Sequence, residues 1–112
     1  MELVRYRKQY KKIAMGYLSY ISKSKLVKKL EETIELYETS DDWELYLLKC
    51  DEDFIGLIGI EIWPEEWKLH HITVNPSHRG EGLAKLMVQK VSERYPDLRP
   101  VATKHTSFLI PS

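Results

Sequence analysis

The chain has 112 residues, which is enough for one compact domain with a single core and too short for two. An apolar fraction of 43% and a formal net charge of zero exclude an intrinsically disordered protein. Cys50 is the one cysteine, which excludes an internal disulfide and a thiolate metal site, and no apolar run approaches the roughly 20 residues that span a bilayer. We therefore expect a cytoplasmic protein without a membrane segment.

Positive and negative charges are separated along the chain. Residues 1–30 carry nine Lys or Arg and one acid, whereas residues 31–66 carry thirteen acids and one Lys. A basic segment can bind nucleic acid or an anionic cofactor, or can form a solvated helix face. Because the lysines lie in segments of helical periodicity without interleaved aromatic residues, we expect a solvated face and no nucleic-acid partner.

The first part of the chain predicts a strand followed by two helices. Leu3 to Tyr6 can form a short strand, and apolar residues recur near a period of 3.6 from Tyr10 to Tyr20. A second amphipathic helix has an apolar stripe from Leu26 to Tyr37, and the turn-forming residues 39–42 end it.

The second part predicts three strands, a helix and a final strand. The strands Trp43 to Cys50, Phe54 to Trp63 and Trp67 to Val74 are joined by tight polar turns, which indicates an antiparallel meander. An amphipathic helix over Gly82 to Tyr95 leads to a strand over Leu98 to Thr103. A crossover through that helix would place the last two strands side by side in parallel, over Leu69 to Val74 and Leu98 to Thr103.

These elements predict one α/β domain over residues 1–112, with a mixed sheet and helices on its faces. Their order is strand, two helices, three antiparallel strands, helix, strand. A last helical turn could begin at Thr106. The lone histidines His78 and His105 lack metal-ligand spacing, so no metal is predicted.

The segment from Ile72 to Lys85 combines an apolar strand, a proline stop, a glycine-bearing basic loop and the start of a helix. The first amides of a helix have no intrahelical partners, and the peptide dipoles add positive charge there, so this end attracts anions. Gly80 and Gly82 would let a pyrophosphate approach the backbone, while Arg79 and Lys85 could add charged contacts. An ordinary strand-to-helix turn remains the alternative.

Two other phosphate-binding motifs do not fit this segment. A dinucleotide-binding loop needs a third glycine and follows the first strand of a parallel βαβ unit, whereas this loop follows an antiparallel meander. A nucleotide-triphosphate loop needs Gly-Lys-Ser/Thr, which is absent from the segment.

The segment resembles the signature of the GCN5-related N-acetyltransferases. Arg79-Gly80-Glu81-Gly82-Leu83-Ala84 fits the pattern Arg/Gln-x-x-Gly-x-Gly/Ala, and Val74-Asn75-Pro76 precedes it at the expected spacing. The predicted order of strands and helices is also that of the family. More narrowly, Lys12 to Gly16, Asp51 to Asp53 and His71 to Arg79 are similar to a small bacterial branch encoded with riboflavin-synthesis genes.

The resemblance implies that acetyl-CoA lies in a cleft where the strand ending at Val74 diverges from the strand near Val101. The pantetheine arm would pair with the first strand, the pyrophosphate would bind the loop and helix start, and an N–H near Val74 would polarise the thioester carbonyl. The acceptor would be a primary amine of a small molecule or protein. The implied cofactor-binding residues are Ile72, Thr73, Val74, Arg79, Gly80, Glu81, Gly82, Leu83, Ala84 and Lys85.

Direct acetyl transfer requires a group that takes the proton of the amine. Glu61, His70 and His71 are the candidates, and strand alternation would place the two histidines on opposite faces. We predict His71 as the base, because it alternates with Thr73, and Glu61 as the second candidate. A half-buried histidine bonded to a neighbour is the structural alternative.

Two departures from the family leave the activity open. The chain has no tyrosine beyond Tyr95 to reprotonate the departing thiolate, and it stops before the family's usual closing hairpin. Solvent, another group or a partner in a homodimer could supply the proton, or the domain could bind acyl-CoA without catalysis. The tryptophans Trp43, Trp63 and Trp67 are predicted to cluster at the meander turns, as core residues or as part of an acceptor pocket or dimer interface.

Overall fold

The computed structural model describes residues 1–21 and 26–103 of the chain. It contains five strands, three α-helices and two short 3-10 turns, in the predicted order of strands and helices. The elements are β1 (Glu2–Arg5), η1 (Lys8–Tyr10), α1 (Lys11–Ile21), α2 (Val27–Thr39), β2 (Trp43–Cys50), β3 (Asp53–Ile62), β4 (Glu66–Val74), η2 (Pro76–His78), α3 (Leu83–Arg94) and β5 (Arg99–Ala102). The helical turn predicted from Thr106, and His105, lie outside the described residues.

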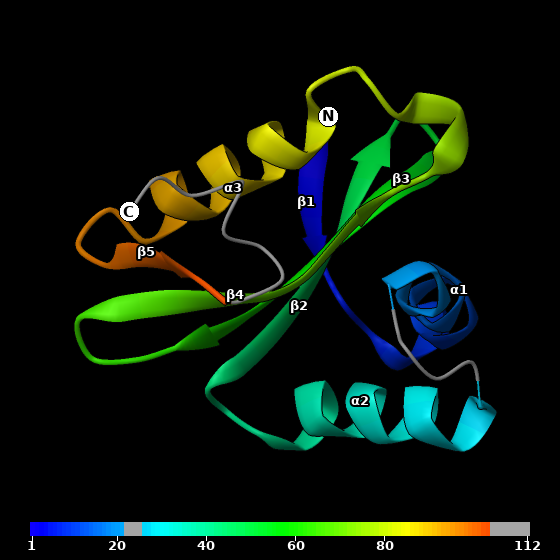
Figure 1. The fold of residues 1–112 in the computed structure, drawn as a ribbon, viewed down its shortest axis with the longest axis horizontal. Helices are drawn as coiled ribbons and strands as arrows, with labels where there is room; N and C mark the ends of the chain where they lie inside the picture. The colour runs from blue at the N-terminus through cyan, green and yellow to red at the C-terminus, as the bar shows by residue number, and fades with distance from the viewer. Residues whose placement is uncertain (22–25, 104–112) are drawn as a thin grey trace.

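The strands form one mixed sheet in the order β1-β2-β3-β4-β5. The first three pairs are antiparallel, and β4 and β5 are parallel. Helices α1 and α2 cover one face of the sheet and α3 covers the other (Figure 1). The predicted fold class is therefore confirmed, and the 3-10 turns are the additions that periodicity did not reveal.

Each face of the sheet carries its own core, because successive strand residues point to opposite faces. On the side of α3, Met87 and Val91 are fully buried against strand residues that include Ile58 and Leu69. On the side of α1 and α2, the buried residues are Ala14, Tyr17, Leu18, Leu30, Ile34, Tyr37, Leu45, Leu47 and Leu57. Within the described residues, no helix is long and apolar enough to cross a membrane.

A buried carboxylate fixes the far end of α3. Glu44 is 9% exposed, and its Oε1 accepts hydrogen bonds from the hydroxyls of Tyr46 and Tyr95, each at 2.6 Å. The Arg5 guanidinium lies 3.7 Å from the other oxygen. Burial, followed by the bond to Glu44, raises the pKa of both tyrosines, so both keep the protons that they donate. This network anchors the helix whose other end faces the loop after β4.

The parallel pairing of β4 and β5 is shorter than predicted. It runs from Glu66 opposite Arg99 to Leu69 opposite Ala102. Among the described residues, no strand pairs with this edge of β4 beyond Leu69, and the rest of β4 continues toward the loop that leads to α3 (Figure 1). Of the predicted parallel stretch Leu69 to Val74, only Leu69 pairs with β5. The edge of β4 after Leu69 has no neighbouring strand among the described residues.

A β-bulge interrupts β4 at the same place. Opposite β3, Gly59 pairs with His71 and Ile60 pairs with Leu69, which leaves His70 as an extra residue. A bulge breaks the strict alternation of side chains and is common beside functional sites.

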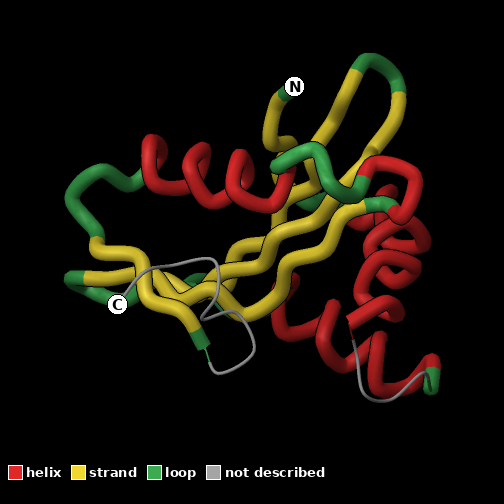
Figure 2. Tube along the Cα trace, turned by 45° about the horizontal axis from the view of Figure 1, so that its top comes forward, coloured by secondary structure: helices red, strands yellow, loops and turns green. Residues whose placement is uncertain are grey.

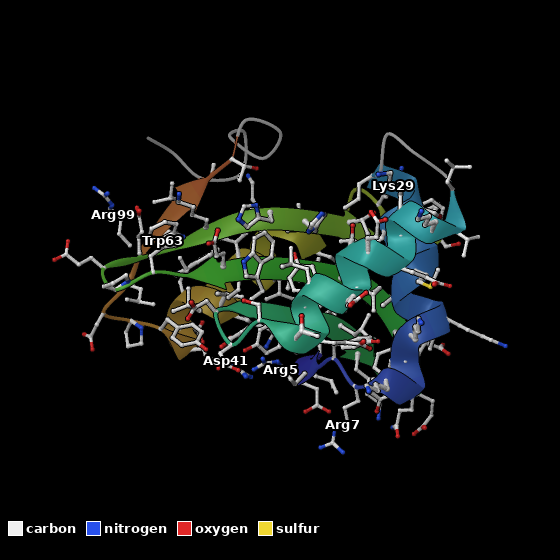
Figure 3. All side chains as sticks on the ribbon, turned by 90° about the horizontal axis from the view of Figure 1, so that it is seen from below. Arg5, Arg7, Lys29, Asp41, Trp63 and Arg99 are labelled. Carbon is white, nitrogen blue, oxygen red and sulfur yellow. The ribbon has the colours of Figure 1, made fainter. Side chains whose placement is uncertain are left out.

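The three tryptophans lie near the turns at one end of the sheet, as predicted, but not all on the same face. Trp67 is fully buried in the core under α3, and Trp43 is half-buried on the opposite face. Trp63 is 42% exposed and lies near Arg99, at the end of the sheet away from α1 (Figure 3). Strand alternation separates them, because the turns where they occur present different faces of the sheet.

Candidate active site

The loop between β4 and α3 is shaped by a capped turn and two glycines. The Asn75 side chain accepts a hydrogen bond from the Ser77 N–H at 2.9 Å, and Pro76 begins the 3-10 turn. Gly80 and Gly82 then have φ angles of 85° and 75°, in the left-handed region that other residues rarely adopt. The backbone conformation therefore strongly favours glycine at both positions.

The start of α3 presents unpaired backbone amides to this loop. The N–H of Leu86 donates to the Gly82 carbonyl at 3.1 Å, so the helix amides of Leu83, Ala84 and Lys85 precede the first intrahelical bond. Gly82 makes no side-chain cap, and a Cβ built on Gly80 or Gly82 would meet no atom within 4 Å. The arrangement fits an anion held against the backbone.

A groove of about 490 Å³ lies between this loop, the last part of β4 and the end of α1. Its lining includes every predicted cofactor-binding residue except Glu81. Glu81 is exposed, and its carboxylate lies 3.5 Å from the His78 ring. Two lining residues were not predicted, Ile21 and His78. His78 belongs to the motif and could have been included, whereas only the tertiary structure brings the end of α1 to the groove.

The edge of β4 beside the groove is not paired with another strand among the described residues. The Asn75 N–H donates to the Ile55 carbonyl in β3 at 2.8 Å. In an antiparallel pair alternate residues point their backbone groups to the partner, so Thr73 also faces β3, while Ile72 and Val74 face the open edge. The Val74 carbonyl there accepts a bond from Arg79 Nε at 3.2 Å.

Helix α1 supports the loop from the side. The Asn75 amide donates to the Tyr17 hydroxyl at 3.3 Å, and the Arg79 guanidinium lies 5.9 Å from the centre of the Tyr20 ring. Figure 2 shows the turn after β4 lying next to α1. The groove is therefore enclosed by elements that are more than 50 residues apart in the chain.

The bulge brings both candidate histidines to the face of the sheet that α2 covers. His70 Nε2 lies 2.8 Å from Glu61 Oε1, and its ring stacks on Trp43 with centroids 4.3 Å apart and planes at 20°. Trp43 also contacts Tyr37, which bonds to His71. The prediction that the histidines point to opposite faces is wrong, because the extra residue at the bulge breaks the alternation on which it relied.

His71 is held by a buried tyrosine. The Tyr37 hydroxyl lies 2.5 Å from His71 Nδ1. Burial raises the pKa of Tyr37, and the negative charge of Glu61 adds to this, while burial and the neighbouring His70 lower the pKa of His71 to about 4. Tyr37 therefore keeps its proton, and its hydroxyl bonds to Nδ1 of an imidazole that the fold favours in its neutral form.

This pair predicts a specific loss of stability in acid. The pKa of His71 is about 4 in the folded chain, below its ordinary value of 6.5, so the unfolded chain binds more protons between these values. The free energy of unfolding should therefore fall by about 2 kcal/mol through this group as the pH drops from 7 to 4.5. Urea denaturation at the two pH values measures it.

His71→Asn is the matched variant for this measurement, because its side-chain oxygen can still accept the Tyr37 proton but does not titrate. Carboxylate contributions are common to both proteins and cancel in the comparison. Equal pH dependence of the two proteins would show that His71 is not held neutral by the fold.

The chain also matches known proteins. The acetyltransferase (GNAT) family matches residues 10–104. The chain belongs to this family. An uncharacterized N-acetyltransferase from the lysA 3' region of Bacillus methanolicus is 46% identical over 109 residues, covering 96% of this chain and 91% of the relative. The protein described here is accordingly an acetyl-CoA-dependent acetyltransferase.

Solved structures share the fold of this acetyltransferase at low sequence identity. The aminoglycoside acetyltransferase AAC(6')-Iy, bound to a bisubstrate analogue containing CoA, has a TM-score of 0.75 at 16% identity, covering 92% of this chain and 78% of that one. A ribosomal-protein-alanine N-acetyltransferase from Brucella melitensis biovar Abortus 2308 has a TM-score of 0.73 at 15% identity, covering 96% and 84%. At these identities the likeness establishes the fold alone.

Proposed function

We propose that this acetyltransferase transfers the acetyl group of acetyl-CoA to a primary amine of a small molecule or protein. The observation that carries the proposal is the groove between the last part of β4, the loop after it and the end of α1, with the bare amides at the start of α3 along its wall. A thioester carrier with a diphosphate group fits such a groove, because the amides favour the anion and the free strand edge favours an extended amide-containing arm.

Each part of the groove has a role in holding the cofactor. The amides of Leu83, Ala84 and Lys85 would bind the diphosphate, together with the side chains of Arg79 and Lys85. The backbone groups of Ile72 and Val74 would pair with the arm along the open edge. The Val74 carbonyl already accepts a bond from Arg79, and its second lone pair can accept a bond from the arm.

The direction of β4 sets where transfer takes place. An arm that follows the open edge from Val74 through Ile72 approaches the end of the β4–β5 ladder at Leu69. The bound thioester supplies an activated carbonyl carbon, and edge N–H groups polarise its oxygen. The predicted bases Glu61 and His71 both lie on the α2 side of the sheet at this point, within one cluster of contacts.

The matched proteins and the sequence similarity suggest several classes of acceptor amine. The matched structures include proteins named for the acetylation of aminoglycosides and of a ribosomal protein. The similarity of residues 12–16, 51–53 and 71–79 to the riboflavin-operon protein RibT suggests an amine connected with riboflavin metabolism. An amine of riboflavin metabolism is therefore one of the acceptors that we propose to test.

The test combines binding with product analysis. Calorimetry with CoA should give saturable heat, and mass spectrometry after incubation with acetyl-CoA should detect an acetylated product in a panel of aminoglycosides, polyamines, riboflavin-pathway amines and peptides. CoA binding without any acetylated product would favour a non-catalytic acyl-CoA-binding module. Absence of CoA binding would overturn the assignment of the groove.

A further inference from the structure

The geometry at the bulge favours one of the three candidate residues as the proton acceptor of this proposed reaction. His70 is the extra residue of β4 and the first residue beyond the last pair of the β4–β5 ladder. It therefore lies at the point where the two strands separate and where the bound thioester would end. His71 is one residue farther along the strand and faces the buried Tyr37.

The hydrogen bond to Glu61 determines how the protons of His70 are placed. An ionised carboxylate only accepts hydrogen bonds, so His70 Nε2 at 2.8 Å from Glu61 Oε1 carries the hydrogen. In a neutral imidazole the other nitrogen then has the lone pair. Nδ1 of His70 can accept a proton, and the carboxylate stabilises the imidazolium that results.

Packing holds this pair in place while leaving it accessible. The Trp43 ring stacks on His70 and restricts its rotation. The side chains of His70 and Glu61 remain 23% and 20% exposed, so an amine can reach them. In His71, by contrast, Nδ1 is already bonded to the hydroxyl of the buried Tyr37.

We propose that His70 is the proton acceptor of the transfer reaction, with Glu61 orienting its ring through Nε2 and Trp43 positioning it by stacking. The proposal rests on the acetyltransferase function proposed above. It replaces His71 as the expected base and changes the role of Glu61 from base to orienting partner.

His70 first takes the proton of the amine and later returns it to the departing sulfur. The amine nitrogen forms a bond to the thioester carbonyl carbon and gives a proton to His70 Nδ1. The carbon–sulfur bond then breaks, and the sulfur leaves with the bonding electrons and receives the proton back from the His70 imidazolium. The products are the acetylated amine and the free thiol, and His70 returns to its neutral form with Nε2 still bonded to Glu61.

Kinetics with acetyl-CoA and the best amine of the panel test the assignment. His70→Gln, which can still donate to Glu61, should lower kcat roughly 100-fold with little change in the KM for acetyl-CoA. Glu61→Gln should lower kcat less than His70→Gln does. Glu52→Gln, at an exposed turn, is the matched carboxyl control. A fall in kcat in His71→Asn as large as that in His70→Gln would overturn the proposal.

Added imidazole separates a chemical role from a structural one. The rate of His70→Ala should rise in proportion to imidazole, because the free base can occupy the space between Trp43 and Glu61, whereas His71→Ala should not respond. A His70→Ala protein that binds CoA normally and shows no rescue, together with an equally slow Glu61→Gln, would identify Glu61 as the base.

Nitrogen NMR of histidine-labelled protein tests the geometry without any acceptor amine. At a pH high enough to leave the imidazole neutral, the resonances that disappear in His70→Gln should report hydrogen on Nε2 and none on Nδ1. Hydrogen on Nδ1 would overturn the proposal even if the protein is an acetyltransferase. If instead the wild-type protein shows the expected tautomer and acetylates no amine of the panel, the proposed function fails and the role of His70 falls with it.

Discussion

Replacement of Gly82 by valine is expected to weaken CoA binding by roughly two to three orders of magnitude, through the loss of two charge-assisted hydrogen bonds. Gly82 precedes α3 with a φ of 75°, and the space beyond its Cα is open toward the groove. A branched side chain would occupy the position proposed for the diphosphate and would also strain the left-handed backbone by about 1–2 kcal/mol. Calorimetry with CoA measures the effect.

Two further variants separate the filled space from the strain. Gly82→Asn tolerates the left-handed backbone better and still fills the space, so it should also bind CoA poorly. Gly16→Val makes the same glycine-to-valine change in α1, where a Cβ meets nothing within 4 Å, and should bind CoA normally. Wild-type affinity in folded Gly82→Asn would mean that no ligand approaches the backbone here.

Replacement of Gly59 by alanine is expected to lower the free energy of unfolding by about 3 kcal/mol, from overpacking and a lost buried hydrogen bond. A Cβ at Gly59 would collide with the hydroxyl and ring of Tyr37. Tyr37 is 5% exposed and fixed between the bond to His71 and an edge contact with Trp43, so it cannot turn aside. Urea denaturation should show the loss, with a fall in Tm of about 12 °C.

The origin of this loss can be isolated with a double mutant. Removing the hydroxyl in Tyr37→Phe relieves part of the collision, so the cost of Gly59→Ala should be smaller in that background. Gly16→Ala, on an exposed helix, should instead be neutral or stabilising by up to about 1 kcal/mol. A Gly59→Ala protein within about 1 kcal/mol of wild type would show that Tyr37 does not pack as closely as the structure places it.

The same residue connects stability with the site. Tyr37 packs on Gly59, bonds to His71 and contacts Trp43, which stacks on His70. The position of α2 on the sheet is therefore coupled to the geometry of the proposed base. We expect Gly59→Ala to lower activity as well as stability, since it displaces the tyrosine that supports this cluster.

Local patterns in the sequence were sufficient to predict the helices and strands and the glycine-bearing loop between β4 and α3. Apolar periodicity and turn residues are contained within short windows, so Trp43–Cys50 was located without error and α3 to within one residue at each end. The two glycines needed no tertiary information either, because their left-handed backbone and the bare amides of α3 are local features of one strand-loop-helix segment.

The arrangement of the proposed catalytic residues was decided only by the tertiary structure. Alternation along β4 predicts opposite faces for His70 and His71, but the register against β3 inserts a bulge at His70 and brings both to the same face. A bulge depends on how two strands align, and the partners Glu61, Trp43 and Tyr37 come from three other elements. The sequence by itself determined the family, the element order and the strand-loop-helix segment with its two glycines. Strand register and helix packing decided which groups each histidine contacts, because those contacts join residues that no local pattern relates.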